Sequence, residues 1–222
     1  PLSQPSDPTR VPIGYLGLYA SAAPSTSLAA AATDTTSAQL ARLAWNQDLL
    51  KSFQFMMKKQ LLHQDIFLIG PPGARKRRLA LAYCELLHRE VEVLSLSPDI
   101  TESDIKQRRE IQSRTAVYVD SVAVRAALLG RVMIIDGLEK AERNVLPVIN
   151  NLLENREMAL EDGRFIVSPA RHAELVERHD EATVRDWNLV RAHPDFLVIA
   201  IGLPSPPYFG NPLDPPLRSR FQ

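Results

Sequence analysis

A basic turn containing two glycines is the strongest chemical signal in the sequence. Residues 70–77 read Gly-Pro-Pro-Gly-Ala-Arg-Lys-Arg, directly after a short apolar run and directly before a helical pattern. In that context backbone N–H groups and the helix N-terminus cradle a polyphosphate, and a lysine six residues after the first glycine reaches its terminal phosphates. Lys76 has this position. The candidate nucleotide-binding residues are therefore Gly70, Pro71, Pro72, Gly73, Ala74, Arg75, Lys76 and Arg77.

Two positions of this turn depart from the G-x-x-x-x-G-K-[ST] pattern. Arg75 replaces the second glycine, and so adds a long side chain where the backbone approaches phosphate closely. Arg77 replaces the Ser or Thr whose hydroxyl would ligate Mg²⁺, and its positive charge would repel that ion at short range. A basic surface turn without a ligand is the alternative interpretation.

A second candidate element is an acid at the end of a buried strand. Residues 132–135 are Val-Met-Ile-Ile, and Asp136 follows them where it could hold Mg²⁺ through water. The next residue, where hydrolysing enzymes carry a glutamate that polarises the attacking water, is Gly137, which has no side chain and cannot act as a base. Glu139 could reach the site through a rearranged loop, but we favour a solvated loop carboxylate at that position.

The third and fourth elements lie near the end of the sequence. Leu203 precedes Pro204, where related ATPases place a polar sensor residue, and a leucine cannot orient water. Arg218 and Arg220 follow in a short helical string, where an arginine at a subunit border can stabilise charge on a neighbour's γ-phosphate. We favour this arginine-finger role for one of the two, the alternative being that both cap a surface helix. The sequence does not separate them.

Short apolar runs alternate with helical patterns along the chain. This alternation predicts a parallel sheet with right-handed crossovers, whose ligands bind outside the carboxyl ends of the strands, just after residues 69, 135 and 201. The expected strands are residues 66–69, 91–96, 132–135 and 196–201, with a hairpin turn at 161–163. The expected helices are residues 37–61, one from about 75, one opened by the loop 99–104, then 121–130, 141–155, a charged insertion at 169–190 and a terminal helix at 217.

Composition restricts the class of protein. In 222 residues, 26 Lys and Arg balance 26 Asp and Glu, so no global field draws the chain to nucleic acid or membrane. Cys84 is the single cysteine, which excludes a disulfide framework, and no apolar run approaches the roughly 18 residues of a membrane span. Residues 1–36 are predicted to form a loosely ordered arm before a core at 37–222. Because the chain does not begin with Met, we expect it to be a piece of a longer protein.

Several segments resemble the dynein-related, MoxR and midasin branch of AAA+ ATPases. The resemblance covers residues 40–222 and is carried by residues 67–73, 134–136, 150–156, 196–204 and 215–221. It implies a three-layer P-loop NTPase core, an α/β fold with a parallel sheet flanked by helices, here truncated before the fifth strand and the helical lid. It also implies ATP and Mg²⁺ as cofactors, neighbouring AAA+ modules as partners and a protein substrate of unknown identity.

The amino-acid sequence of residues 136–158 and 161–165 more closely resembles one eukaryotic multi-module member of this branch. It implies a protein of the mitochondrial matrix with tandem ATPase modules and a C-terminal von Willebrand A domain that recognises a partner. Three interpretations of this module follow. It is a nucleotide-binding or structural module with weakened or lost hydrolysis that lends an arginine finger, an active motor using Lys76, Asp136 and Glu139, or a partner-binding module that uses residues 169–190.

Overall fold

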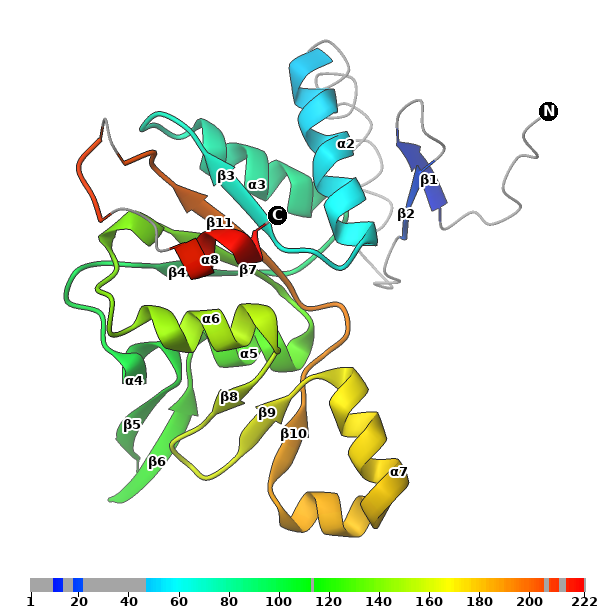
Figure 1. Cartoon of the computed structure of the whole chain (residues 1–222), viewed down its shortest axis with the longest axis vertical. Helices are drawn as coiled ribbons and strands as arrows, with labels where there is room; N and C mark the ends of the chain where they lie inside the picture. The colour runs from blue at the N-terminus through cyan, green and yellow to red at the C-terminus, as the bar shows by residue number, and fades with distance from the viewer. Residues whose placement is uncertain are drawn as a thin grey trace.

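A four-stranded parallel sheet lies at the centre of the molecule (Figure 1). The computed structural model describes residues 10–13, 18–21, 47–112, 114–205, 208–211 and 215–221. In sheet order the strands are β3 (Ile66–Ile69), β11 (Leu197–Gly202), β7 (Val132–Asp136) and β4 (Val91–Ser95). The register pairs Gly202 with Ile69 and Ile201 with Asp136, so the carboxyl ends of three strands lie side by side. The predicted parallel sheet is confirmed.

Helices cover both faces of this sheet, which makes three layers. On one face lie α2 (Gln47–Leu61) and α3 (Arg75–Leu86), and on the other lie α5 (Val122–Leu129) and α6 (Leu146–Glu154). The strands β7 and β11 serve both layers, because alternate residues along a strand point to opposite faces. Met133 and Ile135 belong to the α5 and α6 core, whereas Val132 and Ile134 belong to the α2 and α3 core.

The helix α5 ends where the sequence predicted, at a glycine. Gly130 has φ 70° in the left-handed region and donates its N–H to the carbonyl of Ala126. A Cβ at this position would lie 2.2 Å from Nδ1 of His193. Glycine is therefore required here both by the backbone conformation and by close packing.

The helix predicted over 141–155 is wrong in its first third. After a 3₁₀ turn, η1 (Leu138–Lys140), residues 141–145 form a bend and a turn, and α6 begins only at Leu146. Pro147 then lies in the first turn of α6, where its missing N–H costs no helical hydrogen bond. The proline thus decides where this helix starts.

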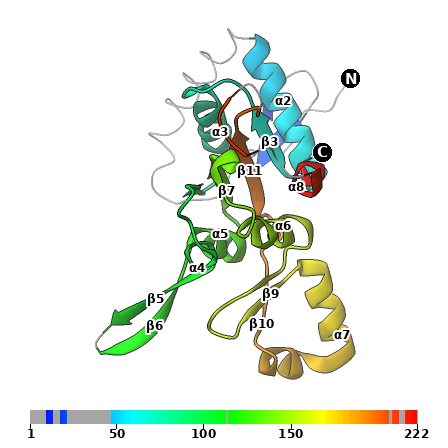
Figure 2. The same ribbon diagram turned by 60° about the vertical axis from the view of Figure 1, so that its left-hand side comes forward.

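The helix expected to be opened by the loop 99–104 is present but is only one turn long. The helix α4 (Glu102–Ile105) has four residues, opened by a capping box between Thr101 and Asp104. An antiparallel hairpin follows, β5 (Gln107–Gln112) with β6 (Thr115–Asp120). Figure 2 shows this hairpin extending away from the sheet and its helices.

The expected turn at 161–163 is confirmed, since β8 (Met158–Ala159) pairs antiparallel with β9 (Phe165–Val167) and Gly163 has φ 88°. The charged insertion forms α7 (Pro169–Asp186), which Ser168 caps at its N-terminus. The helical part is shorter than predicted, because β10 (Leu189–Arg191) pairs with β9 as a parallel strand. In both views α7 and the β5–β6 hairpin lie at the end of the molecule opposite α2 and α3.

Two parts of the predicted arrangement fall largely outside the described residues. Within the expected arm 1–36, β1 (Arg10–Ile13) pairs antiparallel with β2 (Leu18–Ser21). The first part of the helix expected over 37–61 lies outside the described residues, and α2 is described from Gln47. The last element is α8 (Pro215–Arg220), where a terminal helix was predicted.

Candidate functional site

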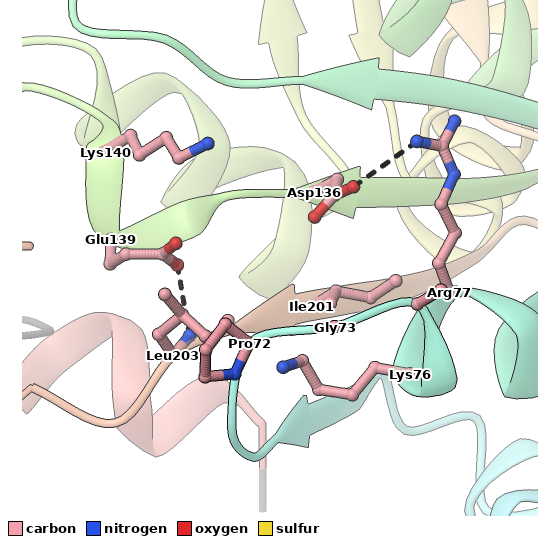
Figure 3. A pocket seen from close by; sticks show the side chains of 11 residues that line it. Pro72, Gly73, Lys76, Arg77, Asp136, Glu139, Lys140, Ile201 and Leu203 are labelled. Atoms are coloured by element: carbon pink, nitrogen blue, oxygen red, sulfur yellow. Dashed lines mark hydrogen bonds and ion pairs between the residues drawn. The ribbon is translucent and has the colours of Figure 1, made fainter. Parts of the chain in front are cut away.

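A cavity of about 360 Å³ opens at the carboxyl ends of β3, β7 and β11 (Figure 3). Its volume lies within the range typical of small-molecule sites, roughly 300–1,000 Å³. The described residues that line it are Pro72, Gly73, Ala74, Lys76, Arg77, Asp136, Glu139, Lys140, Ile201, Gly202 and Leu203. Five of the eight candidate nucleotide-binding residues are thus brought together, whereas Gly70, Pro71 and Arg75 are not among the lining residues.

The turn 70–74 joins β3 to α3 and directs the start of that helix toward the cavity. Gly73 has φ 140°, a conformation that side-chain-bearing residues rarely adopt, and Arg75 is the exposed first residue of α3. The Nζ atom of Lys76 donates hydrogen bonds to the carbonyls of Gly70 at 2.7 Å and Pro71 at 2.6 Å. The ammonium group is therefore held across the turn, at the wall of the cavity.

A guanidinium group faces the acid that was predicted to hold Mg²⁺. Nη1 of Arg77 lies 3.6 Å from Oδ2 of Asp136, with the two side chains 50% and 35% exposed (Figure 3). An ion pair this exposed contributes little to stability, in the range of about 0–1 kcal/mol. Its importance is local, because the positive charge lies beside the carboxylate at the place where a bound cation would be expected.

Glu139 is not the solvated loop carboxylate that we expected. Its side chain is buried, with 6% of the residue exposed, and Oε2 accepts a hydrogen bond from the backbone N–H of Leu203 at 3.2 Å. Its own carbonyl accepts from the N–H of Asn211 at 2.8 Å. A Cβ on Gly210 would lie 2.8 Å from the Glu139 side chain, so the chain after β11 packs directly over this carboxylate. The prediction failed because the covering residues, 203–211, lie 64 to 72 positions away in the sequence.

Of the two other positions expected to be defective, Leu203 lines the cavity, whereas Gly137 is not among the described lining residues. Gly137 follows Asp136 with φ 85° and lets the chain turn into η1, and a Cβ there would lie 3.2 Å from the carbonyl oxygen of Leu96. Leu203 lines the cavity and uses its backbone N–H to hold Glu139. Neither position supplies a polar side chain to the cavity.

Lys140 is a lining residue that the sequence analysis missed. It follows Glu139 in η1, and Figure 3 shows its ammonium group turned toward the space above Asp136. The sequence did contain a signal, a lysine four residues after the strand-end acid. Together with Lys76 and Arg77 it makes three cationic side chains among the described lining residues, against the two carboxylates of Asp136 and Glu139.

The two candidate finger arginines lie away from this cavity and differ from one another. Arg220 forms an ion pair with Glu154 of α6, and its Nε atom is buried without a hydrogen-bond partner among the described residues. Arg218 is exposed, and its guanidinium contacts no other described residue closely enough for a hydrogen bond or ion pair. The structure therefore separates two residues that the sequence could not.

A buried ion pair at the opposite edge of the sheet was also missed. Asp65, just before β3, accepts hydrogen bonds from both terminal nitrogens of Arg156 at 2.8 and 2.9 Å and from the N–H of Val198 at 2.9 Å. The Arg156 guanidinium also lies over the ring of Phe196, 5.1 Å from its centroid. Burial raises the pKa of Asp65, and hydrogen bonding and charge from Arg156 oppose that shift. No local spacing links two residues that are 91 positions apart.

The parallel sheet, the turn between β3 and α3 and the cavity at the carboxyl edge together have the arrangement of a P-loop NTPase-like α/β fold. The family model "AAA domain (dynein-related subfamily)" matches residues 65–221, and the chain belongs to this family. Membership implies nucleotide and Mg²⁺ use and oligomerisation for the family in general. In the part of the chain that the structure describes, every helix is too short or too polar to cross a bilayer.

Similar proteins include one long eukaryotic protein. Mouse von Willebrand factor A domain-containing protein 8 is 58% identical over 176 residues, which cover 79% of this chain and 9% of the mouse protein. An uncharacterized protein of Staphylococcus saprophyticus is 28% identical over 100 residues, covering 43% of this chain and 38% of its own length. A candidate ATPase from Cytophaga hutchinsonii matches in structure with a TM-score of 0.49 and 13% identity, over 88% of this chain and 53% of that one. The chain thus spans only a small part of the mouse relative.

Proposed function

We propose that this chain is a nucleotide-binding AAA+ module whose own hydrolysis is weakened or lost. One arrangement carries the proposal. The cavity combines Lys76, the start of α3 and Asp136, and this combination suits a polyphosphate bound with its counter-charges. The positions that would activate water are an apolar leucine, a glycine without a side chain and a glutamate that is already hydrogen-bonded.

Charge supports binding of an anion. Three cations line the cavity, and one of the two carboxylates, that of Glu139, is turned to a backbone N–H rather than to the cavity centre. The N-terminus of α3 adds the partial positive charge of its unpaired N–H groups. A polyphosphate would offset this charge and replace the Gly70 and Pro71 carbonyls as partner of Lys76.

The proposed loss of hydrolysis rests on two positions and on the burial of one carboxylate. Gly137 and Leu203 have no acid, base or amide to offer a water molecule from a side chain. Of the two carboxylates among the described lining residues, Asp136 faces Arg77, and Glu139 is buried and hydrogen-bonded to the N–H of Leu203. A positioned general base contributes typically about 10²–10⁴ in rate, so its loss alone would reduce turnover by a comparable factor. The active-motor alternative would need Glu139 to leave this hydrogen bond.

We assign the arginine-finger role to Arg218 rather than Arg220. A finger must reach the γ-phosphate of a neighbouring subunit, which requires an exposed and unengaged guanidinium. Arg218 meets this requirement among the described residues, whereas Arg220 is held by Glu154 and secures α8 to α6. The role then serves a neighbour's site and not the cavity described here.

The mouse relative supports a proposal about the larger setting of this chain. At 58% identity over 9% of that protein, this chain corresponds to one segment of a much longer polypeptide. We place it as the first ATPase module of a multi-module protein in the mitochondrial matrix, with the other modules as partners and a protein substrate. Isolation of mitochondria followed by protease protection of the endogenous protein tests the location, and a cytosolic result would reject it.

The binding function is tested on the full-length protein by substituting Lys76 and Glu139. Lys76→Ala removes a charged hydrogen-bond donor to phosphate and should weaken one class of nucleotide sites by roughly ten- to a hundredfold, measured by calorimetric titration with ATP. Lys51→Ala, an exposed lysine of α2, is the matched control and should leave all sites unchanged.

Glu139→Gln then separates the two views of hydrolysis, because glutamine can still accept from the Leu203 N–H but cannot act as a base. We expect the phosphate-release rate to remain within about twofold of wild type. A fall of about 10² or more would show that Glu139 is a catalytic base after all.

A further inference from the structure

The cavity contains an internal cation where the family holds a metal ion. Arg77 comes from the first turn of α3 and extends across to the end of β7, where Nη1 lies 3.6 Å from Oδ2 of Asp136. Figure 3 shows the guanidinium beside the free end of the carboxylate. Both side chains are partly exposed to the cavity mouth, so the pair is open to a ligand on its solvent side.

The residues present do not fit Mg²⁺. This ion takes oxygen ligands, retains several waters and in such sites relies on one or two protein oxygens beside the phosphates. The position that would supply a hydroxyl is Arg77, which supplies none. Asp136 already faces the guanidinium, and the Glu139 carboxylate is buried against the Leu203 N–H. Among the described lining residues, side-chain oxygens come from Asp136 and Glu139 alone, and the charge of Asp136 is offset by the guanidinium beside it.

An arginine can take over part of the metal's electrostatic role. Its planar guanidinium has five N–H donors in a rigid fork that matches phosphate oxygens, and it stays charged at all physiological pH values. Nη1 lies beside Asp136, and the half-exposed guanidinium has further N–H donors that a phosphate could accept from after a side-chain rotation. Lys76 and Lys140 line the same space, so the lining has one positive charge in excess of its carboxylates before any ion enters.

We infer that this site takes its nucleotide as the metal-free polyanion, with the Arg77 guanidinium held by Asp136 in the place of Mg²⁺. The inference rests on the nucleotide-binding function proposed above. A divalent ion brought in on the phosphates would meet the guanidinium within a few ångströms. This repulsion disfavours the metal complex by roughly tenfold or more even in a water-like dielectric.

The test is calorimetric titration of the full-length protein with ATP in EDTA and with ATP in excess Mg²⁺. In the titration, the cavity that contains Lys76 is identified as the binding site that is present in wild type and lost in Lys76→Ala. In wild type this site should bind ATP in EDTA, and excess Mg²⁺ should weaken the apparent affinity by roughly tenfold, since nearly all ATP is then the metal complex. Arg77→Thr restores a hydroxyl and removes the charge, and should reverse the preference. Arg78→Thr, its exposed neighbour on the same helix, should behave as wild type.

The outcomes separate this inference from the function on which it rests. If Lys76→Ala removes no bound ATP in either condition, the binding function falls, and the metal-free site with it. If Lys76→Ala removes a site that binds ATP only with Mg²⁺, or if Arg77→Thr leaves the preference unchanged, nucleotide binding stands and the metal-free site is wrong. A second measurement uses Mn²⁺ as a spectroscopic probe: an ATP-dependent Mn²⁺ signal lost in Lys76→Ala would likewise overturn it.

Discussion

Replacing Asp65 with Asn changes only one atom of the side-chain head group but should destabilise the fold strongly. The carboxylate is 4% exposed and binds Arg156, itself 18% exposed, through two hydrogen bonds of 2.8 and 2.9 Å. Removing one partner of a buried pair leaves an uncompensated charge and costs about 3–5 kcal/mol. Asn can still accept from the Val198 N–H, and Arg156 also donates to the carbonyl of Leu152 at 3.3 Å. We therefore expect about 3 kcal/mol, the lower end of this range.

The measurement is urea unfolding of wild type and Asp65→Asn, monitored by far-ultraviolet circular dichroism. Both curves are fitted with the same dependence of the free energy of unfolding on urea concentration. A loss of about 3 kcal/mol would be roughly a fifth to three fifths of the stability of a typical domain. Glu174→Gln is the control, because Glu174 and Arg178 form an exposed pair on α7, and it should cost no more than about 0.5 kcal/mol. The reasoning fails if Asp65→Asn costs as little as this control.

Three further predictions follow from other parts of the structure. Hydrogen bonding from Arg125 lowers the pKa of Glu92 below its usual 4.5. The ionised carboxylate therefore stabilises the fold above pH 4.5, and this stabilisation is lost as the pH falls through the lowered pKa. Glu92→Gln should accordingly flatten the fall in the free energy of unfolding between about pH 5 and 3. Gly202→Ala places a Cβ 2.9 Å from the ring of Phe67 and should cost about 1–3 kcal/mol by thermal unfolding, and an unchanged melting temperature would show that the ring moves aside at no cost. Arg218→Ala should lower ATP turnover of the full-length protein by about 10³ at the neighbouring site, whereas Arg220→Ala should mainly lower stability; equal turnover effects would reject the assignment to Arg218.

The parts of the fold that were predictable are those with a local cause. Residues 132–135 form a strand buried on both faces because all four are apolar, and Gly130 ends α5 because a left-handed residue is needed there. The turn 70–73 could likewise be placed between a strand and a helix, since its glycines and prolines exclude both regular structures.

The parts that were not predictable depend on distant contacts. The β5–β6 hairpin has a largely exposed second strand, and neither strand shows the clean alternation of apolar and polar residues that predicts a half-buried strand. The burial of Glu139 depends on a segment that returns after β11. The sequence showed that Arg77 stands where a hydroxyl is usual, but not that its guanidinium would meet Asp136, 59 positions further along.

The sharing of β7 and β11 between two cores has a consequence for length variation. Inserting or deleting one residue in either strand would exchange the members of both cores at once, because each side chain beyond that point would change faces. In β7 it would also shift the register with β11 and β4 that sets Asp136 beside Ile201 and Ser95. We therefore expect gains and losses of residues to be tolerated in the connections, such as the hairpin β5–β6 and the turn beside α7, and to be destabilising within the strands.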